Sequence, residues 1–568
     1  MLQQPKSPRF HQRSSMVDRT VAHSNTFDNS PLSNSEKTSR PSSTSDFNTV
    51  VSASTSKRSS LSDLEKGRPS SSSDSAPSSR QFASTSTLQG SADAQPSSND
   101  NIVTWDGPDD TANPRNWSRK RKWTVTLVVS FFTFMSPVGS SISSPTLPAI
   151  SEALGITPGS ILENMTLSIF VLAYALGPLF WGPLSELIGR LPVILSSNLW
   201  FLIFNTACSF SKTPTQMLVF RFLAGFGGAA PQSIGGGIVG DLWSPAERAM
   251  AMSIYSIAPL VGPSTGPFVG GWIAQKADWH WVFWSVSIAD AILQIAGFIL
   301  LRETYAPELL KRKARTLRKA TGNDKLRSPY ELPDRRWTSV MGRGMIKPLQ
   351  FLCVEPIVQV FALYMAVLYG VLYLSLTTFV KVFTSQYHEV PGIAGLHYLA
   401  IALGSTVGGQ IGARALNAIY RRLQEKNGGI GTPEMRLPFL MISATTLPIG
   451  LLIYGWTAQA HAPWIIPDLG VFIYSVGIGG NWTCIQTYLV DNYSIHAASA
   501  IAAASSFRAL AGFGFPLFAD KMYGALGDGW GNSILALICL VIGCPAPFVF
   551  YRYGHKLRSW SKNTSIEQ

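Results

Sequence analysis

Residues 356–383 read PIVQVFALYMAVLYGVLYLSLTTFVKVF, a stretch that carries no charged side chain before Lys381. About 20 apolar residues in helical form are enough to cross the hydrocarbon core of a bilayer. Comparable apolar stretches recur along most of the chain. They lie at 123–146, 165–187, 193–211, 217–239, 249–273, 280–301, 356–383, 392–413, 435–456, 463–488, 497–521 and 528–551. The sequence therefore predicts an all-α membrane protein with twelve transmembrane helices in two bundles of six.

The composition agrees with this prediction. The chain has 568 residues, of which 14% are charged, whereas a soluble domain carries about 25% charged residues. Residues 1–100 contain 29 serines and few large apolar side chains, so they cannot bury enough surface to offset the entropy cost of ordering. We expect a disordered serine-rich cytoplasmic tail at 1–104, an N-terminal six-helix bundle at 105–301, a basic cytoplasmic loop at 302–355, a C-terminal six-helix bundle at 356–551 and a cytoplasmic tail at 552–568.

The positive charge of the chain indicates its orientation. The formal net charge is +13, and residues 302–350 hold 13 basic against 5 acidic side chains, a net charge of +8. Basic residues gathered in one loop between apolar blocks favour a cytoplasmic loop near anionic lipid over a nucleic-acid site. Both termini are then predicted to be cytoplasmic. The absence of an evident retention signal favours the plasma membrane, with the vacuolar membrane as the alternative.

An internal repeat supports the division into two halves. Shifting the chain by 250 residues aligns identical residues of the fourth and fifth spans with the tenth and eleventh. The matched pairs are Gly227 and Gly477, Asp241 and Asp491, Ser244 and Ser494, and Gly262 and Gly512. Two parallel six-helix halves with a binding site between them near the midplane are the geometry of one class of carrier.

Three charged residues inside or beside the spans are candidates for proton coupling and gating. Arg221 lies within the fourth span, and a charge inside the membrane is costly and therefore suggests a function; a snorkelling or packing arginine is the alternative. Asp290 lies in the sixth span, where it is either a titrating carboxyl or a neutral hydrogen-bonded one. Asp241 is expected at the cytoplasmic end of its helix, where pairing with loop cations is the simpler role.

Two motifs suggest moving parts. The stretch 182–190, GPLSELIGR, predicts a tight cytoplasmic turn in which Glu186 and Arg190 form gating contacts with neighbouring helix ends. The second motif closes the fifth span with glycines four residues apart, which allow another helix to approach closely, and with prolines that bend the helix. A generic packing face is the alternative for this motif. Its residues are Gly262, Pro263, Gly266, Pro267, Gly270 and Gly271.

These motifs resemble those of the major facilitator superfamily, and most closely those of the fungal twelve-span drug:proton antiporters. The first motif is similar to G-x-x-x-[DE]-x-x-G-R, although Leu191 replaces the usual basic residue. Arg221 begins a stretch similar to R-x-x-x-G-x-G, and Gly262–Gly271 resembles the antiporter signature. The stretch 113–117, NPRNW, and residues 491–523 add to the resemblance, which covers 105–558. It implies a major facilitator fold and export of small lipophilic compounds in exchange for protons, with Arg221 in the coupling.

Aromatic and polar residues on the seventh and tenth spans are candidates for a substrate cavity. A pocket for varied lipophiles needs aromatic walls and a few polar groups. Contact with lipid or neighbouring helices is the alternative for each of them. The candidates are Tyr364, Tyr369, Tyr373, Phe379, Asn481 and Gln486.

Other functions fit the sequence less well. No H-E-x-x-H, G-x-S-x-G or Walker-type motif is present, which argues against a membrane enzyme, a metal site or ATP-driven export, and no cofactor is expected. A transporter of one specific metabolite, polyamine or nutrient, including an importer, remains the main alternative, and a channel or receptor is a more distant one. We expect a monomer whose partners are small lipophilic substrates, protons and the lipid bilayer.

Overall fold

The computed structural model describes residues 101–331, 337–493 and 496–560. Most of the predicted N-terminal tail and residues 561–568 of the predicted C-terminal tail therefore lie outside the described residues, whereas 552–560 belong to a helix. Within these ranges the chain is helical, and an isolated bridge joins Ile102 to Arg327. The helices are α1 (Arg119–Ser141), α2 (Leu147–Leu154), α3 (Ile161–Ile188), α4 (Arg190–Cys208), α5 (Pro214–Leu242), α6 (Pro245–Lys276), α7 (His280–Leu300), α8 (Ala306–Thr321), α9 (Trp337–Val354), α10 (Pro356–Ser385), α11 (Pro391–Leu396), α12 (Tyr398–Lys426), α13 (Leu437–Gln459), α14 (Ile465–Tyr493), α15 (Ala497–Gly543) and α16 (Pro545–Trp560), with 3-10 turns η1 (Pro114–Asn116), η2 (Ser144–Thr146) and η3 (Pro433–Arg436).

Eight helical stretches among the described residues are long and apolar enough to cross a membrane. The last of them, at 497–558, contains two crossings, because Gly527 has a φ of 73° and breaks the helix inside α15. Helices α5, α6 and α14 are not among the eight, yet they have 29, 32 and 29 residues. Glycines and hydroxyl side chains lower their hydropathy, while their length still exceeds the roughly 30 Å of a bilayer core. The predicted twelve spans are therefore confirmed.

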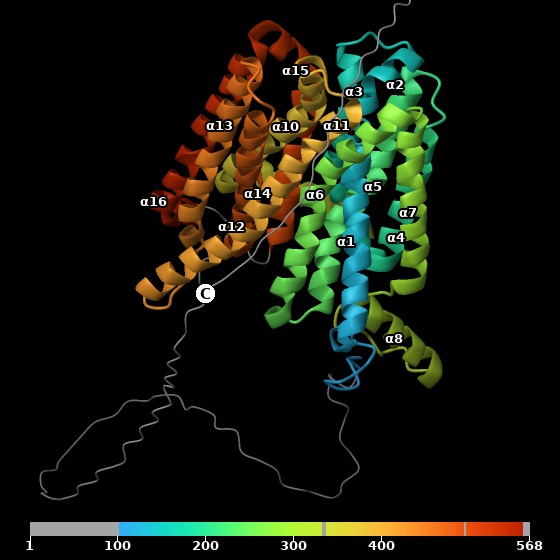
Figure 1. Cartoon of the computed structure of the whole chain (residues 1–568). Helices are drawn as coiled ribbons and strands as arrows, with labels where there is room; N and C mark the ends of the chain where they lie inside the picture. The colour runs from blue at the N-terminus through green and yellow to red at the C-terminus, as the bar shows by residue number, and fades with distance from the viewer. Residues whose placement is uncertain (1–100, 332–336, 494–495, 561–568) are drawn as a thin grey trace, which may run out of the picture. The chain divides into compact units, whose positions relative to one another are not determined.

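The spans form two groups (Figure 1). Helices α1 and α3 to α7 pack on one another and are called the N bundle, and α10 and α12 to α15 form the C bundle. The bundles meet along two seams, where α3 packs against α15 and α6 packs against α11 and α12. The two seams correspond to each other in the repeat. In each seam the fifth span of one half, α6 or the first part of α15, packs against the second span of the other half, α12 or α3.

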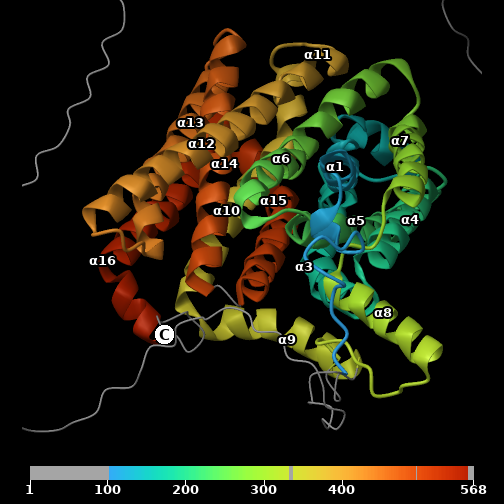
Figure 2. The same cartoon turned by 90° about the horizontal axis from the view of Figure 1, so that it is seen from below.

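The predicted loop between the bundles contains two helices, α8 and α9. Figure 2 shows α9 running along one end of the bundles. Gly344 of α9 packs against Pro183 of the N bundle, and Lys347 Nζ lies 3.0 Å from His496 Nδ1, next to α15. This linker and Arg119 define what we call the basic end of the molecule; the other end is called the opposite end.

The segment before α1 packs against the linker. Lys313 of α8 forms an ion pair with Asp106 at 2.5 Å. Asp110 accepts hydrogen bonds from the backbone N–H groups of Ala112 and Asp106, which hold the pKa of its carboxyl below the usual value. Asn113 caps η1 through Arg115 N. The residues just before the NPRNW stretch thus hold this segment against α8 at the basic end.

Candidate functional site

Arg221 lies on α5 with its side chain fully buried. Its Nη1 donates to Gly139 O at 2.7 Å and its Nη2 to Ser140 O at 2.8 Å. Both carbonyls belong to the last turn of α1, where a helix has no internal donors left for its oxygens. Nε donates to Thr166 O of α3 at 3.1 Å. The guanidinium therefore caps α1, where a cation also interacts favourably with the helix dipole, and ties α1 to α3.

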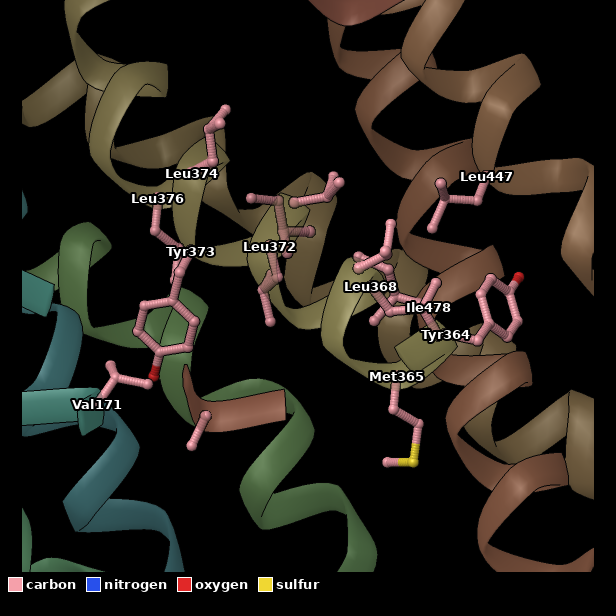
Figure 3. Packing of buried hydrophobic residues seen from close by; sticks show 14 of the residues in the cluster. Val171, Tyr364, Met365, Leu368, Leu372, Tyr373, Leu374, Leu376, Leu447 and Ile478 are labelled. Atoms are coloured by element: carbon pink, nitrogen blue, oxygen red, sulfur yellow. The ribbon is translucent and has the colours of Figure 1, made fainter. Parts of the chain in front are cut away.

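The capped end of α1 also touches the C bundle. Ser140 Oγ lies 2.9 Å from Tyr373 Oη of α10. Figure 3 shows the ring of Tyr373 pointing towards Val171 of α3. Four residues earlier on the same face of α10, the ring of Tyr369 lies 4.9 Å from that of Tyr373. These contacts mark the inner part of the seam between the bundles.

Arg508 of α15 lies beside these rings. Its Cζ is 4.3 Å from the ring centre of Tyr369 and 4.4 Å from that of Trp482 on α14. Only 7% of Arg508 is exposed, and its Nε has no hydrogen-bond partner. One turn further on, a Cβ on Gly512 would lie 2.7 Å from Tyr369 and 3.0 Å from Val171, so the glycine lets three helices converge here.

We call this meeting point of α3, α10, α14 and α15 the junction. It consists of Val171, Tyr369, Tyr373, Trp482, Arg508 and Gly512. It contains two of the predicted cavity residues, Tyr369 and Tyr373. Arg508 also lies within a predicted span, at 497–521, but its aromatic surroundings come from two other helices, α10 and α14, and no local pattern reveals them.

The other predicted cavity residues lie elsewhere in the C bundle. Tyr364 is nine residues before Tyr373, which is two and a half helical turns and places the two side chains on opposite faces. Figure 3 shows the two rings on different sides of α10. A Cβ on Gly543 of α15 would lie 2.4 Å from the Tyr364 ring. Phe379 packs against the rings of Phe383, Tyr398 and Tyr454. Asn481 donates a hydrogen bond to Ser443 O at 3.3 Å. Gln486 is half-buried on α14.

Asp290 is fully buried within the N bundle. Both of its carboxylate oxygens lie 3.1 Å from Asn198 Nδ2 of α4. The same amide donates to Gln294 Oε1 at 2.9 Å, and Gln294 in turn donates to Leu195 O at 3.0 Å. This polar cluster joins α4 to α7 and contains no residue of the junction.

The motif predicted as a tight gating turn lies at the basic end, but residues 182–188 form the end of helix α3, and the turn consists of Gly189 alone, whose φ of 102° redirects the chain into α4. Arg190 at the start of α4 pairs with Asp241 near the end of α5 at 3.4 Å and donates to Ser185 Oγ at 2.8 Å. Glu303 accepts the backbone N–H of Arg190 at 3.0 Å. Glu186 lies in a groove against α8. Arg190 and Asp241 are thus brought together, inside one bundle.

The C bundle repeats this ion pair. Arg436, just before α13, pairs with Asp491 near the end of α14. Helices α13 and α14 are the third and fourth spans of the second half, as α4 and α5 are of the first. In both halves an aromatic ring faces the arginine, Tyr305 at 4.8 Å from Arg190 and Tyr420 at 4.6 Å from Arg436. The repeat of Asp241 and Asp491 therefore corresponds to a repeated contact.

The glycine-proline motif of α6 packs against α1. A Cβ on Gly266 would lie 2.7 Å from Val138 O, and one on Gly270 would lie 2.2 Å from Ile142 O. Gly262 approaches Pro137 and Phe134 in the same way, and Pro263 and Pro267 lie within the helix. Gly271 faces Pro391 of α11, in the other half. The motif thus supplies both a backbone-to-backbone contact within the N bundle and part of a seam.

Polar contacts join the bundles at the opposite end. Asp520 of α15 pairs with Lys381 of α10 at 2.9 Å and accepts a hydrogen bond from Asn164 of α3 at 2.9 Å. Ser144 Oγ donates to Leu376 O. The sequence prediction did not single out this contact group. Its signal was the presence of Lys381 and Asp520 close to the ends of their spans.

Comparison with known proteins identifies the family. Residues 129–516 match the family model described as the Major Facilitator Superfamily. The chain belongs to this superfamily of membrane transporters. It is 43% identical to the efflux pump vrtL of Penicillium aethiopicum over 82% of this chain and 92% of that one. It is 42% identical to the efflux pump radE of Floropilus chiversii over 81% of this chain and 85% of that one.

A solved structure shows the same fold. The xylose transporter XylE from E. coli, in a partially occluded inward-open conformation, aligns with a TM-score of 0.57 over 76% of this chain and 98% of that one. The sequences are 16% identical, so the likeness concerns the fold alone. The resemblance to the superfamily and the predicted major facilitator fold are both confirmed.

Proposed function

We propose that this transporter is a proton-coupled efflux pump that exports small lipophilic compounds, such as drugs, antifungals or secondary metabolites, by alternating access. The observation that carries the proposal is the likeness to two proteins named efflux pumps, each at more than 40% identity over more than four fifths of this chain. The glycine-proline motif of α6, which resembles the antiporter signature, supports the direction of transport.

The seams support alternating access. The polar contacts of Asp520, Lys381 and Asn164 close the seam at the opposite end, and rocking of the bundles would break them. The close approach of α6 to α1 lets α6 move with the N bundle as one body. At the basic end, Glu186 and Arg190 lie where the linker helices meet the N bundle, which suits a gating role.

Proton coupling needs a carboxyl group whose contacts change between states. Asp241 contacts Arg190, which begins another helix at the basic end. Asp290 hydrogen-bonds to an amide inside the N bundle. Asp241 is therefore the stronger candidate, and Arg221 acts by holding the end of α1 against α3.

The charge distribution supports the placement in the membrane. Helices α8 and α9 lie at the basic end with the segment before α1, and basic residues are favoured in cytoplasmic loops. Both termini then lie in the cytoplasm, with the plasma membrane as the location and a monomer as the working unit.

The test is efflux from a pump-deleted fungal strain that expresses the full chain. Cells are loaded with fluorescent lipophiles or azoles, and efflux is followed with and without a protonophore. We expect faster efflux than in the empty strain and its collapse when the proton gradient is removed. Efflux that survives the protonophore would contradict proton coupling, and gradient-driven uptake would replace the efflux proposal by import.

A further inference from the structure

Arg508 is the one feature of the junction that the proposed transport cycle leaves unexplained. We propose that its guanidinium binds the anionic group of the exported compound, so that the preferred substrates are lipophilic aromatic weak acids, such as carboxylates. This inference rests on the proposed function and narrows its substrate class.

The contacts of Arg508 are incomplete for a buried cation. Burying a charge in an apolar site costs several kcal/mol unless it is paired and hydrogen-bonded. Arg508 is more than nine-tenths buried, its Nε has no partner, and within the described residues it forms no ion pair or hydrogen bond. On α14 and α15, the carboxylates closest in sequence to Trp482 and Arg508 are Asp491 and Asp520, and these two already pair with Arg436 and Lys381. The missing partner is therefore an anion from outside the chain.

The aromatic contacts determine which parts of the guanidinium stay available. The Cζ atom of Arg508 lies over the rings of Tyr369 and Trp482, and these cation–π contacts supply no hydrogen-bond acceptor oxygen to its N–H groups. A guanidinium carries its N–H donors in a planar fork, which suits a carboxylate with two oxygens. An aromatic acid would place its ring among Tyr369, Tyr373 and Trp482 and its carboxylate on the N–H edge.

The position along the helices suits a substrate site. Arg508 is eleven residues after the first residue of α15, and the helix breaks at Gly527. Tyr369 lies near the middle of α10, which runs from Pro356 to Ser385. Carriers built from two repeats bind their substrates near this depth, between the halves. Val171 of the N bundle faces Gly512 here, so the site is shared by both bundles.

The experiment measures binding directly on the purified full chain in detergent. The probes are matched pairs that differ in charge alone: 2-naphthoic acid with 2-naphthamide, and pyrenebutyric acid with its primary amide. Affinities are measured by calorimetric titration at neutral pH. We expect each acid to bind at least about tenfold more tightly than its amide, because a charge-assisted hydrogen bond in a buried site contributes that much.

Variants assign this preference to Arg508. Arg508→Gln should remove the acid preference while amide binding changes little, and Arg508→Lys should keep part of it because the positive charge remains. Arg422→Gln removes one positive charge from the exposed part of α12 and should leave the preference as in the unmodified protein.

Two results would overturn the inference. One is equal or absent binding of acid and amide in both pairs by the unmodified protein. The other is an acid preference that survives in Arg508→Gln. Because binding is measured without transport, an acid preference in a protein that exports neither probe from cells would count against the efflux proposal and not against the anion site.

Discussion

The N bundle and the C bundle each bury one arginine near the seam, and the two are used differently. Arg221 in the N bundle is fully buried and donates to the carbonyls of Gly139, Ser140 and Thr166. Arg508 in the C bundle is covered by aromatic rings and has a buried Nε without a partner. Buried arginine therefore has hydrogen-bond acceptors in the N bundle, whereas the buried arginine of the C bundle has a donor atom without an acceptor.

This difference follows from what surrounds each side chain. In the N bundle, α1 ends at Ser141 and offers the free carbonyls of its last turn to Arg221. In the C bundle, α10 continues to Ser385, past the level of the junction, so its backbone oxygens are used within the helix. A cation on α15 then finds rings but no acceptors, which is the condition for binding an anion.

The largest expected effect separates the two arginines by one substitution. Arg221→Gln should reduce efflux at least about tenfold and lower the thermal midpoint by roughly 5 °C or more, because carbonyls of α1 and α3 lose their donors. Arg508→Gln should leave the midpoint within about 2 °C, since the charge that it removes forms no ion pair or hydrogen bond among the described residues. The measurement is thermal unfolding of both purified variants. Equal losses of stability would break the comparison.

The fold was predictable because the decisive signals are local. A span of 20 or more apolar residues needs no partner to be recognised, and the repeat was visible in Asp241 and Asp491. Three spans, α5, α6 and α14, are rich in glycine, and the sequence still predicted them as apolar stretches at 217–239, 249–273 and 463–488. The linker was predicted as a loop, and its helices α8 and α9 were missed because their basic residues dominated the pattern.

The site was only partly predictable, since its contacts join distant segments. Tyr369 and Tyr373 share a helix face and were found together. Tyr364 and Phe379 lie on the same span and looked equivalent, but they pack inside the C bundle. The partners of Arg508 come from α10 and α14 and its lack of an acceptor depends on all the surrounding helices. One sequence without its folded context does not contain that information.

The second expected effect concerns how the fifth span of each half packs. A Cβ on Gly270 would meet the backbone oxygen of Ile142 at 2.2 Å, whereas one on Gly512 would meet the ring of Tyr369. A ring can turn and a helix backbone cannot, so overpacking costs more at Gly270. We expect Gly270→Ala to slow efflux about tenfold and Gly512→Ala to slow it about threefold, at equal surface expression. A larger loss of efflux in Gly512→Ala than in Gly270→Ala would contradict the expectation that the backbone contact at Gly270 tolerates less than the ring contact at Gly512.

The third expected effect is at the opposite end, where Asp520 occupies the place in the repeat that Gly270 has in the N bundle. Asp520→Asn loses the ion pair with Lys381, a half-exposed contact that contributes up to about 1 kcal/mol. We expect a cysteine at Ser144 to react about two- to fivefold faster with a membrane-impermeant maleimide on whole cells. Lys212→Gln, a charge change at the same end on the exposed connection between α4 and α5, should leave the rate unchanged. An unchanged rate in Asp520→Asn would mean that this ion pair does not hold the seam closed.

The smallest expected effect tests whether the repeated ion pairs of the two bundles have the same role. Double-mutant cycles of Arg190 with Asp241 and of Arg436 with Asp491 measure the coupling free energy of each ion pair from shifts in thermal midpoint. We expect about 1 kcal/mol or less for each pair, because all four side chains are partly exposed to solvent. Equal coupling energies indicate two structural clasps. If Asp241 also carries the proton, Asp241→Asn alone will make efflux insensitive to the pH gradient, while Asp491→Asn keeps that sensitivity. Loss of the pH response in both variants would mean that proton coupling needs both Asp241 and Asp491, and it would contradict the proposal that Asp241 alone carries the proton.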